Sequence, residues 1–578
     1  MPPGDGTSGE PAGPRGRLRA AAPVLCFMVI LLLAGALRLY RIQEQSVWYD
    51  EYLSAAWLGE PSLGAFLHEQ RAENWEMTPV YYSLEYMWAR LFAGSIVAVR
   101  LLSVWFSLAA VSVLFAFGYR LFGLWGAVTA ALCMAISPTQ LFHAQGIRPY
   151  ALLVLLGLVS AWALYELART DKRRWWGVHI AANALLCWSH LMGALLVPAQ
   201  ALFILVSRRF SLRRAAAWFA AHLLIAATLA AWAAMIEVRP PPEAAEVNTA
   251  EVFYRVFNDK PIYLTDWASR RQFVAAKDPT GYLVRTLENA RWLNFTLVRL
   301  LFLLAVLYAL NSILWQARPA LRGEDGWSRF LRGAGRIGTA AVLAWWWYWW
   351  PLPRLAVLAA VLLGMALGWR YWLPGEEQTS RGNGLNALQT LLFLTLWLLV
   401  PFLLLYVIDL IRPSGFQERY ALYSKPALYL LAGGAVALMR SLPLRAIVTA
   451  CLVVLYAHEA ALACVIPMRP PYRAVAQALQ REAGEADRIL VHGWHWRRLL
   501  EFNMETPPAP VSHTQGYEDL LERTRQALED GETLFAILAG GEDDMGRYEE
   551  WLEARHVDYT RRRFIGMHDI VLFTVGEL

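Results

Sequence analysis

Cysteine and charge are both scarce in this chain of 578 residues. The five cysteines lie in or beside apolar stretches, and none forms a CxxC or Cys/His pair with the spacing of a metal site. We therefore expect neither a disulfide framework nor a zinc–thiolate site, and we interpret the cysteines as small buried apolar side chains. Charged residues make up 17% of the chain, whereas a soluble domain has about 25%. This composition argues against an ordinary soluble protein.

The chain is instead rich in long apolar runs. Hydrophobic residues form 57% of the chain, and the mean hydropathy is +0.34. Such runs recur through most of the first 470 residues. Each is close to the roughly 20 helical residues that cross a hydrocarbon core of about 30 Å. The sequence therefore predicts a polytopic α-helical membrane protein.

Hydropathy predicts roughly 13 transmembrane helices. In chain order they fall near residues 22–39, 97–118, 124–141, 150–168, 175–190, 192–207, 215–236, 293–315, 338–351, 353–369, 387–409, 421–439 and 445–466. If the N-terminus is cytoplasmic, the arginine-rich connections fall inside and the long polar segments fall outside, as the positive-inside rule requires. The net charge of +6 then reflects membrane topology, and no nucleic-acid partner is predicted.

Three regions are predicted along the chain. Residues 1–20, rich in glycine and proline, form a disordered cytoplasmic N-terminus. Residues 21–466 form the transmembrane domain, with outer loops 40–96 and 237–292. Residues 467–578 alternate strand-like and helix-like segments, which predicts a small soluble α/β domain outside the membrane. This domain carries no glycine-rich phosphate-binding fingerprint.

Polar and ionisable side chains gather at the predicted outer ends of several spans. A charged group at membrane depth costs about 2.5–3.5 kcal/mol on insertion scales, so such groups usually mark a site or a water-filled cavity. Four stretches of sequence supply them, and the predicted topology places all four at one face. They are Asp50 and Glu51; His143, Gln145, Arg148 and Tyr150; His190; and Glu418, Arg419, Tyr420 and Lys425.

The residue types in this set predict a particular chemistry. A carboxylate can remove a proton from an attacking hydroxyl, while Arg and Lys stabilise a leaving phosphate. The planar guanidinium binds phosphate oxygens in pairs and stays charged when it is partly desolvated. Because no nucleotide is supplied outside the membrane, the phosphate would have to arrive on a lipid. The pattern therefore predicts displacement at a carbon that bears a lipid-linked phosphate.

Four stretches of the sequence also carry a family resemblance. They are "WYDEYLSAAWL", "MTPVYYSLEYMWARLFAGSIVAVRLLS", "SPTQLFHAQGIRPYALLVLL" and, more weakly, "ERYALYSKPALYLLAGG". With these stretches the chain resembles membrane glycosyltransferases of the GT-C fold, specifically glycosyltransferase family 39 and its bacterial relatives. These relatives include protein O-mannosyltransferases and, more remotely, aminoarabinose transferases. The chain departs from the eukaryotic members because no inserted β-trefoil-like domain is evident.

The resemblance implies an inverting transfer of a sugar from a polyprenyl-phosphate donor to an acceptor outside the membrane. It places the catalytic base at Asp50, with Glu51 beside it to share that role or to orient the acceptor. The residues that contact the donor phosphate correspond to Arg148, or to Arg419 and Lys425. The cavity would be supported by the other polar residues of the set, which are His143, Gln145, Tyr150, His190, Glu418 and Tyr420.

The resemblance also implies that no metal or other cofactor is required. The expected partners are the lipid donor and an acceptor that is a protein, a lipid or a glycan. The expected location is the plasma (inner) membrane, with the active site and the C-terminal domain on the extracytoplasmic side.

Each of these interpretations has a simpler alternative. Asp50 and Glu51 can cap an interfacial helix and complement its dipole, and Arg148 can extend to lipid headgroups. His492 and His495 lie near two tryptophans, where they could stack on a sugar or pack in a small core. At the level of function, the alternatives are a transporter or flippase for lipid-linked sugars and a non-catalytic envelope scaffold. A transporter would show inverted repeats and charges at the bilayer midplane, and neither is evident.

Overall fold

The computed structural model describes residues 14–234, 385 and 387–576, except for 74–77, 93, 171, 208, 412–417, 440, 466–467, 505, 540–541 and 565–568. The predicted spans near 293–315, 338–351 and 353–369 lie outside the described residues, as does the predicted loop 237–292.

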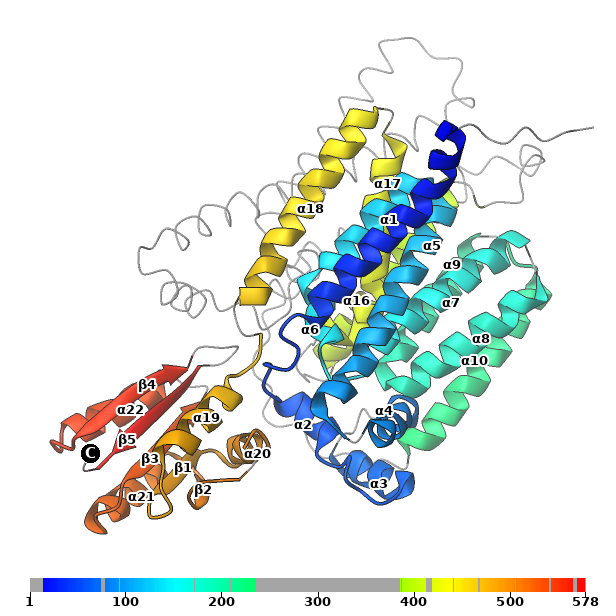
Figure 1. The fold of residues 1–578 in the computed structure, drawn as a ribbon. Helices are drawn as coiled ribbons and strands as arrows, with labels where there is room; N and C mark the ends of the chain where they lie inside the picture. The colour runs from blue at the N-terminus through cyan, green and yellow to red at the C-terminus, as the bar shows by residue number, and fades with distance from the viewer. Residues whose placement is uncertain are drawn as a thin grey trace, which may run out of the picture.

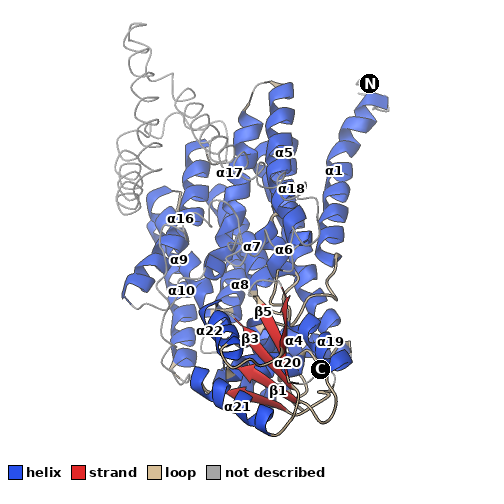
Figure 2. Ribbon diagram, turned by 90° about the vertical axis from the view of Figure 1, so that its left-hand side faces the viewer, coloured by secondary structure: helices blue, strands red, loops and turns tan. Residues whose placement is uncertain are grey.

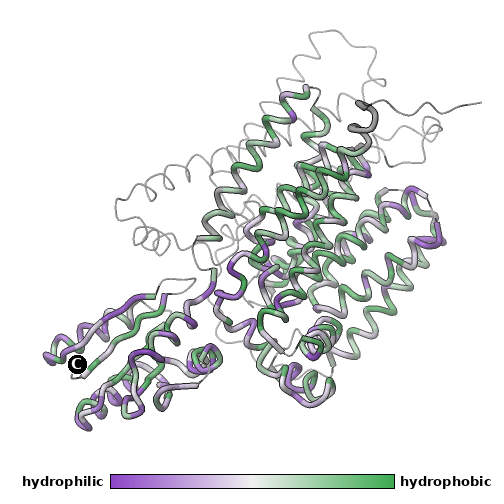
Figure 3. Tube along the Cα trace, in the orientation of Figure 1, coloured by the Kyte–Doolittle hydropathy of each residue, from purple (hydrophilic) through white to green (hydrophobic). Residues whose placement is uncertain are grey.

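A bundle of long helices forms the main body of the described chain (Figure 1). Its elements are α1 (Pro14–Leu39), α5 (Ile96–Ile136), α6 (Pro138–Ala144), α7 (Tyr150–Thr170), α8 (Arg173–Ser189), η1 (Leu191–Leu195), α9 (Leu196–Ser207), α10 (Leu212–Ala233), α16 (Ala387–Ile411), η5 (Glu418–Ser424), α17 (Lys425–Leu438) and α18 (Leu442–Val465). Figure 3 shows hydrophobic residues along most of the length of these helices and a mixture of hydrophilic and hydrophobic residues in the C-terminal segment.

Six helical segments of the described residues are long and apolar enough to cross a membrane. They are Ala21–Leu39, Ile96–Ile136, Tyr150–Thr170, Leu212–Trp232, Gln389–Ile408 and Arg419–Leu438. Of two shorter apolar helical segments, Leu191–Ser207 lies between the third and the fourth of these in the sequence, and Leu442–Val454 follows the sixth. The chain is therefore that of a multi-pass helical membrane protein.

Glycines define the course of α5 and its contact with α17. At Gly123 the backbone leaves the helical region, with φ 72° and ψ −166°, so α5 is two helical segments joined at a bend. This residue separates the two predicted spans 97–118 and 124–141. Farther along, a Cβ added to Gly433 of α17 would lie 2.3 Å from the carbonyl oxygen of Gly126. Only glycine at this position lets the two backbones approach so closely.

A buried arginine joins α1 to α5. The side chain of Arg38 has no exposed surface. It donates hydrogen bonds to Ser107 Oγ at 2.8 Å and to the carbonyl oxygen of Ala135 at 2.9 Å. Because these acceptors satisfy the guanidinium, its charge is tolerated inside an apolar bundle.

Three short helices connect α1 to α5 at one end of the bundle (Figure 1). They are α2 (Tyr49–Ala55), α3 (Leu63–Glu73) and α4 (Pro79–Leu91). The sequence predicts helices too polar to span a membrane in this region, and the structure places helices there.

The C-terminal segment forms a five-stranded mixed sheet with helices on both faces. The strands are β1 (Arg488–His492), β2 (Val511–Thr514), β3 (Leu534–Ala539), β4 (Tyr559–Phe564) and β5 (Ile570–Val575), in the order β2-β1-β3-β5-β4. β1 is parallel to β2 and β3, while β5 is antiparallel to β3 and β4. The helices are α19 (Tyr472–Glu482), α20 (Trp494–Phe502), α21 (Tyr517–Glu529) and α22 (Glu542–Glu553). Residues of α19 and α20 pack in one core cluster, and residues of α21 and α22 pack in another.

The sheet and its helices lie at the end of the bundle that carries α2, α3 and α4 (Figures 1 and 2). Direct contacts join α20 to the segment that leads into α2. The side-chain amide of Asn503 accepts a hydrogen bond from the Val47 amide at 3.0 Å and donates one to the Val47 carbonyl at 2.9 Å. The rings of Tyr52 and Phe502 meet edge to face, with centroids 5.5 Å apart. The C-terminal domain therefore holds the chain directly beside Asp50.

Candidate active site around Asp50

α2 places two adjacent carboxylates at its N-terminal end. Trp48 precedes the helix in an extended conformation, and its carbonyl oxygen accepts the first helical hydrogen bond from Tyr52 N at 2.8 Å. Asp50 and Glu51 both lie in the first turn, where negative charge complements the helix dipole. Successive residues of a helix point in different directions, so the two carboxylates have different surroundings.

Glu51 is fully buried among positive groups. Its Oε2 lies 3.0 Å from Arg100 Nη2 and 2.5 Å from Arg469 Nη1, and its Oε1 accepts from the Ile147 amide at 3.0 Å. Burial raises the pKa of Glu51, but the two guanidinium groups and the amide together hold that pKa below its ordinary value. Glu51 is thus an ionised carboxylate that joins α2, α5, the α6–α7 loop and the segment before α19.

Asp50 pairs instead with a residue from the far end of the membrane domain. Its Oδ2 lies 2.6 Å from Arg419 Nη1, and the two side chains are 11% and 12% exposed. Three aromatic rings surround this guanidinium, with its Cζ 5.9 Å from the ring of Trp48, 5.9 Å from Tyr150 and 5.7 Å from Tyr420. Of the two carboxylates, Asp50 is the one with some access to solvent.

Arg148 contacts the backbone of Asp50. Its Nη1 is 3.3 Å from the Asp50 carbonyl oxygen and 3.3 Å from the hydroxyl of Tyr82, and its Cζ is 5.9 Å from the Tyr150 ring. Tyr150 therefore contacts both Arg148 and Arg419, and it also lies close to the rings of His143 and His190, at 4.9 and 5.8 Å between centroids. Its ring is at the centre of the cluster.

The environment of His143 is strongly positive. Burial lowers the pKa of His143 well below its ordinary value, and the charges of Arg419, Lys425, Arg469 and Arg148 lower it further. Its imidazole is therefore neutral near pH 7. Four cationic side chains close enough to act on one buried ring make this a region suited to an anionic ligand.

The remaining predicted residues fall into four groups. Lys425 is buried at the start of α17, and its Nζ donates to Thr139 Oγ1 at 3.2 Å. His190 and Tyr420 join the cluster through ring contact, with centroids 5.4 Å apart. Gln145 points elsewhere, because its Nε2 donates to the carbonyl oxygens of Arg38 and Tyr40 at the end of α1. Glu418 begins η5, and its side chain lies outside the described part of the chain.

Sequence reasoning did not identify several residues of this region. Arg100 and Arg469 each bind Glu51, and Tyr82 contacts Arg148. Arg100 lies within the predicted span 97–118, and a charged residue in an apolar span is a signal that could have identified it. Arg469 stands directly after the last predicted span, and nothing in its local sequence connects it to Glu51.

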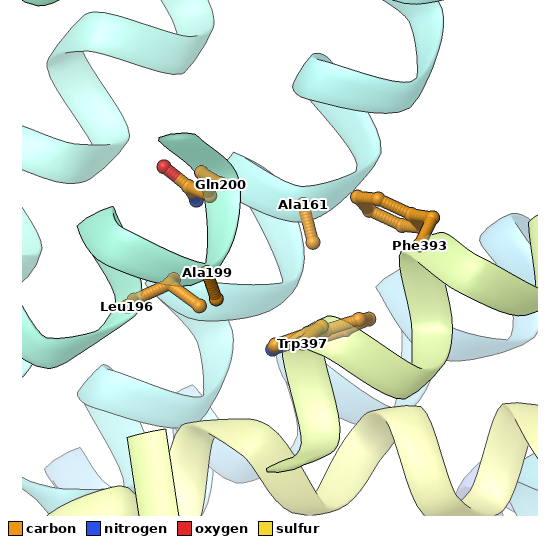
Figure 4. A pocket seen from close by; sticks show the side chains of 6 residues that line it. All are labelled: Ala161, Leu196, Ala199, Gln200, Phe393 and Trp397. Atoms are coloured by element: carbon orange, nitrogen blue, oxygen red, sulfur yellow. The ribbon is translucent and has the colours of Figure 1, made fainter. Parts of the chain in front are cut away.

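No metal cluster marks the site in the described residues. No group of three or more His, Cys, Asp or Glu side chains lies close enough to hold a metal ion within them. A small cavity of about 10 Å³ lies among α7, α9 and α16, lined by Ala161, Leu196, Ala199, Gln200, Phe393 and Trp397 (Figure 4). This lining contains none of the predicted site residues.

One family profile matches the chain. Residues 77–233 match the family described as dolichyl-phosphate-mannose-protein mannosyltransferase. The matched range contains His143, Arg148, Tyr150 and His190 but neither Asp50 nor Arg419. The match confirms the resemblance over these residues and supports a glycosyltransferase activity. No curated protein matches the chain significantly.

Several solved structures are similar to the chain at low sequence identity, and three of them are described here. ArnT from Cupriavidus metallidurans in the apo state is 14% identical, with a TM-score of 0.39, over 96% of this chain and 98% of that chain. The same protein bound to undecaprenyl phosphate is 15% identical, with a TM-score of 0.40 and the same coverage. An Archaeoglobus fulgidus oligosaccharyltransferase, tethered to an acceptor peptide with the NVT sequon, is 12% identical, with a TM-score of 0.38, over 95% of this chain and 73% of that chain.

Proposed function

We propose that this chain is an inverting membrane glycosyltransferase. It moves a sugar from a polyprenyl-phosphate donor to an acceptor hydroxyl on the outer face of the membrane. The observation that carries the proposal is the ion pair between Asp50 and Arg419, 2.6 Å apart and only partly accessible to solvent, in a cluster that also holds Arg148 and Lys425. It is supported by the family match over residues 77–233.

In this proposal Asp50 is the general base. Its carboxylate accepts the proton of the acceptor hydroxyl as that oxygen forms a bond to the anomeric carbon of the donor sugar. The bond between the anomeric carbon and the phosphate oxygen breaks on the opposite face, and the lipid phosphate leaves with the electron pair. A single displacement of this kind inverts the configuration at the anomeric carbon.

Arg419 has two partners in this mechanism. Without substrate it pairs with the Asp50 carboxylate. When the donor binds, its guanidinium can pair with phosphate oxygens in a bidentate manner and stabilise the charge that develops on them. Loss of the ion pair leaves Asp50 available to the acceptor hydroxyl.

Arg148 and Lys425 complete the binding of the phosphate. They approach the cluster from the α6–α7 loop and from the start of α17, so the leaving group meets positive charge from more than one direction. The neutral imidazole of His143 adds a hydrogen-bonding group without adding charge. The proposed mechanism requires no metal, because these cations oppose the charge of the leaving phosphate.

Glu51 has a different part in the proposal. Both of its oxygens already accept hydrogen bonds, from Arg100, Arg469 and the Ile147 amide. A carboxylate engaged in this way is poorly placed to accept a proton from a substrate. We assign it to positioning α2, and Asp50 alone to proton transfer.

The test is a transfer assay on the purified full chain with radiolabelled polyprenyl-phosphate sugars. Asp50→Asn should reduce kcat by at least about 100-fold, within the usual range for a general base, while the protein remains folded. The matched control is Glu44→Gln, which changes an exposed acid in the same segment and should leave transfer unchanged. Full activity in folded Asp50→Asn would refute the assignment of the base. Mass spectrometry of lipid that copurifies with the chain would identify the donor.

A further inference from the structure

One face of α4 is polar and completely buried. Thr78, Tyr81, Tyr82 and Glu85 follow one another at the spacing i, i+3, i+4 and i+7, which places them on the same side of the helix. All four are buried, with at most 2% of their surface exposed. A short interfacial helix does not need such a face for packing, because apolar side chains would serve that purpose better.

Several polar atoms on this face have no hydrogen-bond partner among the described residues. Neither oxygen of Glu85 has a hydrogen-bond partner among the described residues, and the same is true of Thr78 Oγ1. An unsatisfied buried polar atom is costly, and native proteins usually pair such atoms with water or a ligand. Thr78 and Glu85 are seven residues apart, or about 10 Å along the helix axis. One water molecule cannot bridge that span.

The face lies beside the proposed catalytic centre. Tyr82 contacts Arg148 through its hydroxyl, and the same Arg148 nitrogen contacts the Asp50 carbonyl oxygen. Burial raises the pKa of Glu85 well above its ordinary value, although the charge of Arg148 opposes that shift. This shift favours the neutral carboxylic acid, which can both donate and accept a hydrogen bond.

We propose that this face of α4 binds the hydroxyl groups of the transferred sugar, with Glu85 as the residue that determines sugar specificity. The inference rests on the proposed function and identifies the part of the chain that recognises the donor sugar. A neutral carboxylic acid can donate to one sugar hydroxyl and accept from its neighbour. The rings of Tyr81 and Tyr82, 5.4 Å apart and nearly perpendicular, supply apolar surface for the C–H groups of the sugar ring.

The experiment compares a polyprenyl-phosphate hexose with its singly deoxygenated analogues as donors for the purified full chain. For the wild-type protein, removing the hydroxyl that Glu85 binds should lower kcat/KM at least about 100-fold, because a site built for a hydroxyl rejects its absence strongly. In Glu85→Leu, the kcat/KM for the parent sugar should fall to that for the analogue, so that the two values differ by less than about 3-fold. Glu85→Gln should retain part of the discrimination, since an amide also donates and accepts. Met87→Leu, on the exposed side of α4, is the control.

A stability measurement separates this role from a structural one. Because Glu85 has no partner in the described protein, Glu85→Leu should leave the Tm of the substrate-free protein unchanged or raise it. A fall in Tm with equal loss of activity on every donor would mean that Glu85 is structural. Wild-type discrimination in Glu85→Leu would overturn the proposal even if Asp50→Asn is inactive. By contrast, wild-type protein that transfers no sugar from any lipid phosphate would refute the proposed function itself.

Discussion

Asp50 and Glu51 are neighbours in sequence, but their side chains have different partners. Asp50 meets one arginine and is partly accessible, whereas Glu51 meets two arginines and an amide in a fully buried site. A buried charge network is strongly destabilised when one member is removed, since the remaining charges stay in a medium that solvates them poorly. The two residues should therefore respond differently to the same kind of substitution.

Glu51→Gln is expected to destabilise the protein by about 3–5 kcal/mol, because Arg100 and Arg469 both lose their counter-charge. Thermal unfolding in detergent, followed by intrinsic tryptophan fluorescence, would measure the loss. Asp50→Asn serves as the comparison and should unfold close to the wild-type temperature. Equal Tm values for Glu51→Gln and the wild type would contradict a structural role for Glu51.

The pH dependence of stability should report on His143. Its pKa is lowered in the folded protein, by burial and by the surrounding cations, so protons bind more readily to the unfolded chain. The neutral imidazole contributes its full stabilisation when the pH is above the pKa of the unfolded chain, about 6.5. As the pH falls below that value, the free energy of unfolding decreases by at most about 1.4 kcal/mol per pH unit. Unfolding measured between pH 7 and pH 5 should show a shallower pH dependence in His143→Gln. Parallel curves for the two proteins would count against this effect.

Individual site residues were predictable to the extent that their local sequence was unusual. Asp50, Arg148 and Arg419 are polar groups beside long apolar runs, and this signal placed them at helix ends. The partner of each was not predictable, because the Asp50–Arg419 pair depends on how distant helices pack. Glu85 was missed for a related reason. Its surroundings look like an ordinary amphipathic helix, and only the folded structure shows that its oxygens are buried without partners.

At the scale of single elements, the contact of α5 with α17 depends on the absence of side chains. Gly433→Ala would place a Cβ 2.3 Å from the Gly126 carbonyl oxygen, so the helices would have to separate. We expect a loss of about 1–3 kcal/mol, as is usual for overpacking, measured as a lower Tm. Gly35→Ala in α1 is the control, because a Cβ there meets nothing within 4 Å. If both variants unfold at the same temperature, the close approach does not contribute to stability.

Helices and strands differ in how well the sequence defined them. Spans such as 150–168 and 387–409 correspond to α7 and α16 within a few residues, since a long apolar run determines both type and length. Four segments of the C-terminal region have the pattern of strands: "DRILVHG", "TLFAILAG", "VDYTRRRF" and "HDIVLFTVG". They contain β1, β3, β4 and β5, whereas β2 was not predicted. β2 has only four residues, and none of its side chains before Thr514 is fully buried. Its pattern was therefore too weak to detect.

At the scale of the whole molecule, the C-terminal domain supports the segment that carries the proposed base. Asn503 forms two hydrogen bonds with the backbone of Val47, three residues before Asp50. Asn503→Leu would remove both and should move α2 slightly without unfolding either domain. A displacement of about 1 Å at a catalytic group can reduce the rate about 100-fold.

We therefore expect Asn503→Leu to lower kcat by roughly 10–100-fold with little change in the KM for the lipid donor. Steady-state transfer kinetics on the full chain would measure both constants. Arg525→Ala, an exposed substitution on α21, provides the control and should match the wild type. Unchanged kcat in Asn503→Leu would show that the contact does not position Asp50.

The contact between Asn503 and Val47 also has a consequence for biosynthesis. The two residues are 456 positions apart, so at about 5–20 residues per second a ribosome needs roughly 25–90 seconds to make the second after the first. During that interval α2 and Asp50 exist without Asn503, and Glu51 exists without Arg469. The nascent chain therefore cannot assemble the proposed catalytic centre while its first helices are being inserted into the membrane. The centre is completed only when the last domain has been synthesised and folded.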